Sequence, residues 1–127
     1  MPIKSAALRQ ASSVLLVLAI AIVFIGGEMP GAGSLFPSPW DKVVHVITFG
    51  TIGVLAGLSF TSRSLLLIWV FITCLGSADE IHQIFIVGRQ PGFDDLIADM
   101  IGALLVLPLI AWLRLRLYQP ALTLGKQ

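Results

Sequence analysis

Four stretches of the chain consist almost entirely of apolar residues, and short polar segments separate them. The stretches lie at about 11–27, 43–60, 65–85 and 96–117. A helix needs about 20 mostly apolar residues to cross the hydrocarbon core of a bilayer. Each stretch therefore predicts one membrane-spanning helix, and the fold class that we expect is all-α, a four-helix transmembrane bundle. We expect the 127 residues to form a single membrane domain.

The first apolar stretch has two interpretations. Residues 11–27 contain no charge and follow Lys4 and Arg9, a pattern that fits either a membrane helix or the apolar core of a cleaved signal peptide. The small residues of the segment 31–33 would suit cleavage. Three further apolar stretches favour the first helix of a multi-span protein, but the pattern alone leaves both interpretations open.

The composition agrees with a membrane protein. Hydrophobic residues make up 57% of the chain and charged residues 12%, about half of the charge that a soluble domain carries. The net charge of +1 provides no basic excess for phosphate contacts, so we expect membrane lipid and no nucleic acid among the partners. The single cysteine, Cys74, excludes an internal disulfide and a CxxC metal site.

The basic residues predict the direction of the helices. In a four-span arrangement six of them fall on one side of the membrane, and two, Lys42 and Arg89, fall on the other. Because cytoplasmic loops carry the excess of Lys and Arg, both termini should be cytoplasmic. All seven acidic residues and both histidines then lie toward the outer side. The six inner residues are Lys4, Arg9, Arg63, Arg114, Arg116 and Lys126.

Local signals refine the helix ends. Ser38, followed by a proline and then by Asp41 three positions on, predicts Ser38 as the N-cap of the second helix. Asp94 or Asp95 is expected to cap the fourth helix. Pro108 should bend that helix, because proline lacks a backbone N–H and clashes with the preceding turn.

Small residues predict close contacts between helices. Gly53 and Gly57 form a GxxxG motif in the second span, and Ala98 and Gly102 have the same spacing in the fourth. Such pairs allow two helix backbones to approach each other. We expect these spans to pack against each other or against the third.

A polar cluster interrupts the outer end of the third span, where Asp79, Glu80, His82 and Gln83 follow one another closely. An ionised side chain at the middle of a bilayer costs about 2.5–3.5 kcal/mol on insertion scales, and less near the interface. Such groups need partners or water. On a helix Asp79 and Gln83 share a face, Glu80 neighbours Gln83, and Asp79 also lies near His82.

Helical spacing places further polar residues at the same depth. His45 lies one turn below Asp41, and Asp99 lies one turn below Asp95. Glu80, on a helix that runs the opposite way, lies about one turn below the outer loop. We therefore expect His45, Glu80 and Asp99 to converge in a covered pocket that faces outward.

Arg89 belongs to the short loop between the third and fourth spans. It can fold back over the pocket and bind a carboxylate through two hydrogen bonds. Two roles stay open for this residue: neutralising Glu80, Asp95 or Asp99, or gripping a phosphate or carboxylate of a ligand.

This ordered set of residues resembles the VanZ-like family, small multi-span bacterial membrane proteins named for a member linked to resistance to the glycopeptide antibiotic teicoplanin. The resemblance extends from Asp41 to about Leu105 and implies a multi-pass protein of the bacterial cytoplasmic (inner) membrane. Two positions depart from the family pattern: Asp99 replaces the usual Asn, and Val106 replaces a Gly. The matching residues are Asp41, Lys42, His45, Asp79, Glu80, His82, Gln83, Gly88, Arg89, Asp95, Gly102 and Ala103.

From the residues and the resemblance together we select candidates for the site. The candidate catalytic residues are Glu80, Asp99 and His45, because carboxyl and imidazole groups can exchange protons with a ligand. The structural alternatives are a capping role for Asp41 and a satisfied buried state for His45. The candidate binding residues are Arg89, Gln83, Asp95, Asp41, Lys42, Asp79 and His82.

A metal site is an alternative use of the same side chains. His45, Glu80 and Asp99, supplemented by Asp79 or Asp95, would offer mixed nitrogen and oxygen ligands that suit Zn²⁺ or Mn²⁺. The spacing is not diagnostic, because the chain has no HExxH motif. The sequence therefore identifies no cofactor.

The function that we expect is that of a VanZ-like membrane protein whose outward-facing polar site recognises or alters a cell-envelope component. A lipid-linked wall precursor is one such molecule, and glycopeptide antibiotic susceptibility would then depend on the protein. The sequence does not decide between recognition and enzymatic catalysis. The alternatives are a small carrier or proton relay, which the lack of titratable residues in the inner half disfavours, and a non-catalytic membrane assembly subunit.

Overall fold

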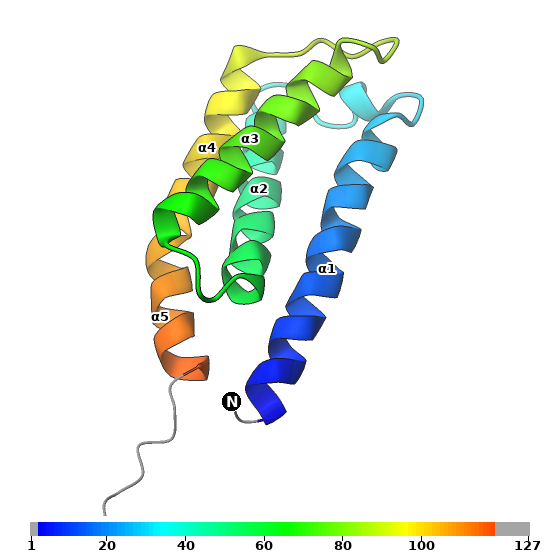
Figure 1. Cartoon of the computed structure of the whole chain (residues 1–127). Coiled ribbons are helices and arrows are strands. Elements are labelled where there is room, and N and C mark those ends of the chain that lie inside the picture. Colours follow the sequence, from blue (N-terminus) through cyan, green and yellow to red (C-terminus); the bar gives the residue numbers. More distant parts are fainter. Residues whose placement is uncertain (1–2, 119–127) are drawn as a thin grey trace, which may run out of the picture.

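The structure, a computed structural model, describes residues 3–118 as a bundle of helices joined by short loops (Figure 1). A 3-10 turn, η1 (Ala32–Ser34), lies in the first loop. The helices are α1 (Ile3–Gly27), α2 (Trp40–Ser59), α3 (Leu65–Gln83), α4 (Phe93–Leu105) and α5 (Leu107–Leu117). The predicted all-α fold is confirmed.

Four helical segments are long and apolar enough to cross a membrane: Ser5–Gly27, Trp40–Ser59, Leu65–Gln83 and Phe93–Leu117. The number of predicted spans is confirmed. Three of them begin earlier than predicted, because polar residues at their N-terminal ends are already helical. The second and third end one and two residues earlier than predicted.

The fourth span consists of α4 and α5. The helix is interrupted at Val106, two residues before Pro108, where proline was expected to disturb the backbone ladder. Regular bonding resumes at once, since the Ile110 N–H donates to the Val106 carbonyl oxygen at 2.9 Å. The interruption lies about two turns from Asp99, the deepest polar residue of this span.

Helices α2 and α4 form a close helix pair built on glycine. A Cβ atom on Gly102 would overlap the backbone of Val46, and one on Gly50 would lie 3.3 Å from the Gly102 carbonyl oxygen. Gly53 lies against the junction of α4 and α5, and Gly57 lies against α5. The second and fourth spans therefore pack against each other, as their small residues predict.

The apolar core fills the half of the bundle away from the acidic residues. It takes side chains from every span, and these residues are almost entirely buried. They are Leu16, Phe49, Ile52, Ala56, Ile68, Ile72, Ala103 and Ile110. Most of the protein surface is also apolar. In the most apolar 18-residue segment of α1, only 11% of the residues are buried inside the protein. Surfaces of this kind face lipid in a membrane.

The start of α1 and the end of α5 lie at the same end of the bundle, and the loops 28–39 and 84–92 lie at the other (Figure 1). An even number of crossings requires this arrangement. Which end faces the cytoplasm stays a prediction from the basic residues. One of those residues, Lys126, lies outside the described range.

Arg114 fastens the helices to one another at the end of the bundle away from the loops 28–39 and 84–92. Its Nε donates to the Gly57 carbonyl oxygen at 2.9 Å. The two terminal nitrogens donate to the carbonyl oxygens of Arg63, at 2.7 Å, and Phe60, at 3.0 Å. These acceptors lie at the end of α2 and in the following loop, where helical carbonyls lack partners within the helix.

The helix starts differ from the prediction in detail. Pro39, and not Ser38, is the N-cap of α2, and no side chain caps this helix. The predicted capping role of Ser38 is therefore wrong. The Asp41 carboxylate accepts from Lys42 at 2.8 Å instead, because an ammonium group gives a charge-assisted bond that a backbone N–H does not.

Helix α4 also begins without a side-chain cap. Its N-cap is Gly92, so the prediction that Asp94 or Asp95 is the cap is wrong. Both carboxylates lie in the first turn, where the positive end of the helix dipole favours negative charge. They contact Lys42, which provides a stronger partner than the backbone.

Candidate functional site

A polar cavity of about 430 Å³ opens at the end of the bundle that carries the loops 28–39 and 84–92. Its wall is formed by the first turns of α2 and α4, the end of α3, residues 88–92 and Gly33 of the first loop. The charged or titratable residues in the wall are Asp41, Lys42, His45, Arg89, Asp94 and Asp95.

Lys42 links α2 to α4 at the wall of the polar cavity. Its Nζ atom lies 2.8 Å from carboxylate oxygens of Asp41 and Asp94 and also contacts Asp95. The Asp94 side chain is 68% exposed and the Asp95 side chain 12% exposed. One ammonium group therefore neutralises carboxylates from two helices, a role that its position beside Asp41 did not reveal.

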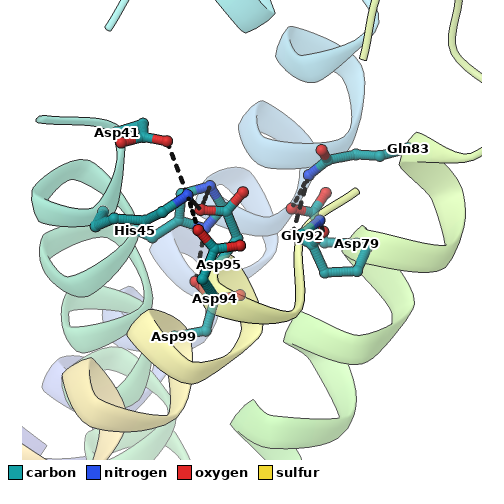
Figure 2. Close-up of polar contacts among 10 residues, drawn as sticks. Asp41, His45, Asp79, Gln83, Gly92, Asp94, Asp95 and Asp99 are labelled. Atoms are coloured by element: carbon teal, nitrogen blue, oxygen red, sulfur yellow. Dashed lines mark hydrogen bonds and ion pairs between the residues drawn. The ribbon is translucent and has the colours of Figure 1, made fainter. Parts of the chain in front are cut away.

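His45 and Asp99 meet one turn deeper. The Nδ1 atom of His45 lies 2.8 Å from Oδ1 of Asp99, whose side chain is fully buried. The Nε2 atom of His45 lies 3.8 Å from Oδ1 of Asp95. Figure 2 shows Asp99 farther into the bundle than Asp95, with the imidazole beside both carboxylates.

The end of α3 contributes Glu80, Asp79 and Gln83, all of which are buried. The Gln83 side-chain amide donates to Asp79 at 3.0 Å and to Glu80 at 3.3 Å. The second Glu80 oxygen accepts from the backbone N–H of Gly92 at 2.7 Å. Glu80 therefore connects α3 to the start of α4, while Asp79 and Gln83 face each other across one turn (Figure 2).

The predicted convergence of three side chains is present in the structure. His45, Glu80 and Asp99 each offer one ligand atom, and these atoms all lie within 4.8 Å of one another. They come from α2, α3 and α4 respectively. The depth estimate from helical spacing succeeded because all three helices are regular where the residues lie.

Of the two roles left open for Arg89, the structure does not show the neutralising bond to a carboxylate. It forms no ion pair with any residue in the range 3–118, and its buried Nε atom has no hydrogen-bond partner. Its aliphatic part packs near Gly33, where an added Cβ atom would lie 3.1 Å from the Arg89 Cδ. This contact sets Arg89 against the first loop, and the residue lines the polar cavity.

His82 lies apart from the other candidates. Its Nε2 atom is 3.0 Å from Oε1 of Glu28, and its ring contacts Phe24 of α1. It does not line the polar cavity, because it lies on the face of α3 that is turned toward α1. The sequence placed His82 near Asp79 correctly along the helix but did not reveal the partner in the first loop.

The sequence pattern did not predict two contributions to the site. Gly92 supplies a backbone donor to Glu80, and Gly76 lets Asp99 approach α3, since a Cβ atom there would lie 2.8 Å from Oδ2 of Asp99. Gly76 lies one turn from Glu80 on the same face of α3, a spacing that could have indicated this contact.

Comparison with protein families identifies the group to which the chain belongs. The family model VanZ/LLP1 matches residues 7–114. The chain belongs to the VanZ/LLP1 family. This match spans all four candidate membrane helices and every residue that surrounds the polar cavity, and it confirms the resemblance seen in the motifs. No curated protein and no solved structure matches the chain in the corresponding comparisons.

The geometry of this VanZ/LLP1 protein permits three kinds of chemistry in one place. Glu80, Asp99 and His45 can accept or donate protons. The same three groups have the types and positions of metal ligands. Arg89, at the cavity wall without a carboxylate partner, can bind a phosphate or carboxylate through its planar guanidinium.

Proposed function

We propose that this VanZ/LLP1 membrane protein uses its polar cavity, facing the outside of the bacterial cytoplasmic membrane, to recognise or alter an anionic component of the cell envelope. A lipid-linked wall precursor has the required chemistry, with a charged head group and an apolar anchor. Susceptibility to glycopeptide antibiotics would depend on this activity. Five basic residues of the described range, Lys4, Arg9, Arg63, Arg114 and Arg116, belong to the opposite end of the bundle and support the orientation.

The observation that carries this proposal is the state of Arg89. It lies among acidic residues, yet it pairs with none of those described, and its Nε atom is buried and unpartnered. Guanidinium groups in such surroundings usually form ion pairs. A side chain held at a cavity wall with its donors free is suited to an incoming anion, which it can bind with two parallel hydrogen bonds.

An apolar hollow beside the polar cavity supports a lipid-linked ligand. It has a volume of about 170 Å³ and lies between α3 and the start of α4, where its wall includes Ile84, Phe93 and Leu96. Pro91 and Gly92 belong to the walls of both hollows. A head group in the polar cavity would therefore have an apolar path beside it toward the lipid.

Glu80, Asp99 and His45 are the groups that would act on such a ligand. Glu80 touches the apolar hollow, and His45 the polar cavity. Their short separation allows proton exchange between them and an entering oxygen atom. In a purely recognising protein the same groups would accept hydrogen bonds from hydroxyl or amide groups of the ligand.

A proton relay or carrier is less well supported. The layer next to His45 and Asp99 consists of apolar side chains such as Phe49, Ile72 and Ala103, which are almost fully buried. A path across the membrane would need further polar groups or water beyond them. The inner half contains no acidic residue and no histidine, so no chain of such titratable groups continues the path.

The test uses cells that depend on this protein for glycopeptide tolerance, at matched protein levels. Arg89→Ala, Glu80→Gln and Asp99→Ala should each lower tolerance, and purified Arg89→Ala protein should retain less anionic envelope lipid by native mass spectrometry. Arg116→Ala and Glu28→Gln are matched controls, because these residues lie outside the polar cavity. Wild-type behaviour of all three site variants would refute the proposal and favour a purely structural assembly subunit.

A further inference from the structure

Three metal-ligating side chains from three helices meet beside the polar cavity. The candidate ligand atoms of His45, Glu80 and Asp99 lie within 4.8 Å of one another. Ligand atoms of one tetrahedral Zn²⁺, each about 2.0–2.2 Å from the ion, lie about 3.3–3.6 Å from one another. The widest separation in the cluster therefore has to shorten by roughly 1 Å for all three side chains to contact a single ion, a change that side-chain rotation can supply.

One of these ligand groups has an unused, buried oxygen atom. Asp99 is fully buried. Its Oδ1 pairs with His45, whereas its Oδ2 has no hydrogen-bond partner among residues 3–118. A buried carboxylate oxygen without a partner is energetically costly. The absence of a side chain at Gly76 lets this carboxylate pack directly against α3, the helix that carries Glu80.

Acidic groups outnumber basic groups around the site. Six carboxyl groups surround the polar cavity and the cluster beside it, whereas Lys42 and Arg89 are the permanently charged bases among the described residues there. Lys42 contacts only the three outer acids. The inner acids are left with neutral donors and His45. The six acids are Asp41, Asp79, Glu80, Asp94, Asp95 and Asp99.

We propose that His45, Glu80 and Asp99 bind one divalent first-row metal ion, either Zn²⁺ or Mn²⁺. An imidazole nitrogen with two carboxylate oxygens suits these ions better than Mg²⁺ or Ca²⁺, which take oxygen ligands almost exclusively. The imidazole binds in its neutral form, so uptake of the ion releases any proton held between His45 and Asp99. Three protein ligands leave a coordination position for water or for an oxygen of a ligand.

This inference stands on the geometry of the three side chains and does not rest on the proposed function. The two are nevertheless compatible. A divalent ion beside the polar cavity reduces the excess of negative charge that an anionic group would meet on its way to Arg89.

The experiment measures metal retention by the full chain, purified in detergent with any affinity tag removed. The protein is treated with a chelator, exposed to Zn²⁺, Mn²⁺ or Mg²⁺ alone, desalted and assayed by mass spectrometry for metal per chain. Wild-type protein should retain about one Zn²⁺ or Mn²⁺ per chain and no Mg²⁺. Its thermal unfolding temperature should rise with the retained ion, because the folded state alone has the site.

Near-isosteric variants locate the ion. Glu80→Gln and Asp99→Asn should weaken retention by about tenfold or more. Glu28→Gln and His82→Gln remove the same chemical groups from a neighbouring pair outside the cluster and should retain metal like the wild type. Absence of retention by wild-type protein, or equal retention by both site variants, would overturn the proposal. If a site variant does not fold, metal retention by the wild-type protein still tests the proposal.

Arg89→Ala separates this proposal from the proposed function. It should keep the metal, because Arg89 is not a ligand, and lose the anionic lipid. Loss of metal with retained lipid would contradict both assignments. Metal retention without any effect of Arg89→Ala on lipid or on tolerance would leave the metal site intact and refute the proposed function.

Discussion

The Nδ1 atom of His45 lies 2.8 Å from Oδ1 of Asp99, although the two residues are 54 positions apart in the chain. This contact joins α2 to α4 beside the polar cavity. It also fixes the imidazole orientation, so the other ring nitrogen faces Asp95. The pair is therefore both a link between helices and a part of the candidate site.

Removing the Asp99 carboxylate should destabilise the bundle, whereas an amide should preserve the contact. In Asp99→Asn the amide oxygen still accepts from His45, so the unfolding free energy should change little. Asp99→Ala leaves the imidazole without this partner and should cost about 1–3 kcal/mol. Thermal unfolding in detergent, compared between the two variants, measures the difference. Equal midpoints would show that the His45 contact contributes no stability.

Lys42 should be necessary for holding the first turns of α2 and α4 together. Lys42→Met leaves the carboxylates of Asp41, Asp94 and Asp95 facing one another without a cation. Repulsion between like charges should lower the unfolding midpoint by several degrees, and by more in low salt than in high salt. Lys42→Arg, which keeps the charge, should recover most of the loss. A midpoint independent of both charge and salt would contradict this role.

Gly102 should not tolerate a side chain. A Cβ atom there would lie 2.9 Å from the Val46 Cα and 3.0 Å from its carbonyl carbon. Backbone atoms cannot move aside as a flexible side chain can, so α2 and α4 would have to separate. Gly102→Ala should cost about 1–3 kcal/mol.

Gly26→Ala is the matched control for that substitution. No atom lies within 4 Å of the added Cβ at Gly26, and alanine favours a helix over glycine. This variant should be as stable as the wild type or slightly more stable. The yield of monodisperse protein and the unfolding midpoint are measured for both variants. Similar behaviour of the two variants would refute the close approach at Gly102.

Arg114 should stabilise the end of the bundle opposite the polar cavity through geometry as well as charge. Its three bonds reach carbonyl oxygens of Gly57, Phe60 and Arg63. Arg114→Lys retains the charge but not the planar fork, so it should cost about 1–2 kcal/mol. The control is Arg116→Lys, because Arg116 only lies over the ring of Trp112, 5.8 Å from its centroid. Equal unfolding midpoints for the two variants would disprove the special role of Arg114.

The sequence predicted the spans and the convergence of His45, Glu80 and Asp99 because both follow from periodicity. Apolar length locates the spans, and the rise of 1.5 Å per residue places polar side chains at a common depth. The contact of α2 with α4 was predictable for a related reason, since small residues mark close approach. These features depend on regular helices, which a pattern describes well.

The sequence pattern did not predict contacts that depend on loop conformation or on competition between alternative partners. Arg89 packs against Gly33 in the first loop, and no periodicity positions one loop against another. Lys42 collects carboxylates that were expected to serve as caps, because an ammonium group at 2.8 Å is the stronger partner. His82 pairs with Glu28, a residue beyond the end of the first span whose position depends on the turn that follows it.

The most direct test of the proposal asks on which side of the membrane the polar cavity opens. Cys74 is first replaced by serine, and single cysteines are then introduced at Gln90, an exposed residue in the cavity wall, and at Ser62, an exposed residue in the loop at the opposite end. Intact cells are treated with a membrane-impermeant maleimide. We expect labelling of Gln90→Cys in intact cells and of Ser62→Cys only after permeabilisation. The reverse pattern would place the cavity in the cytoplasm and contradict a role in recognising an envelope component from outside.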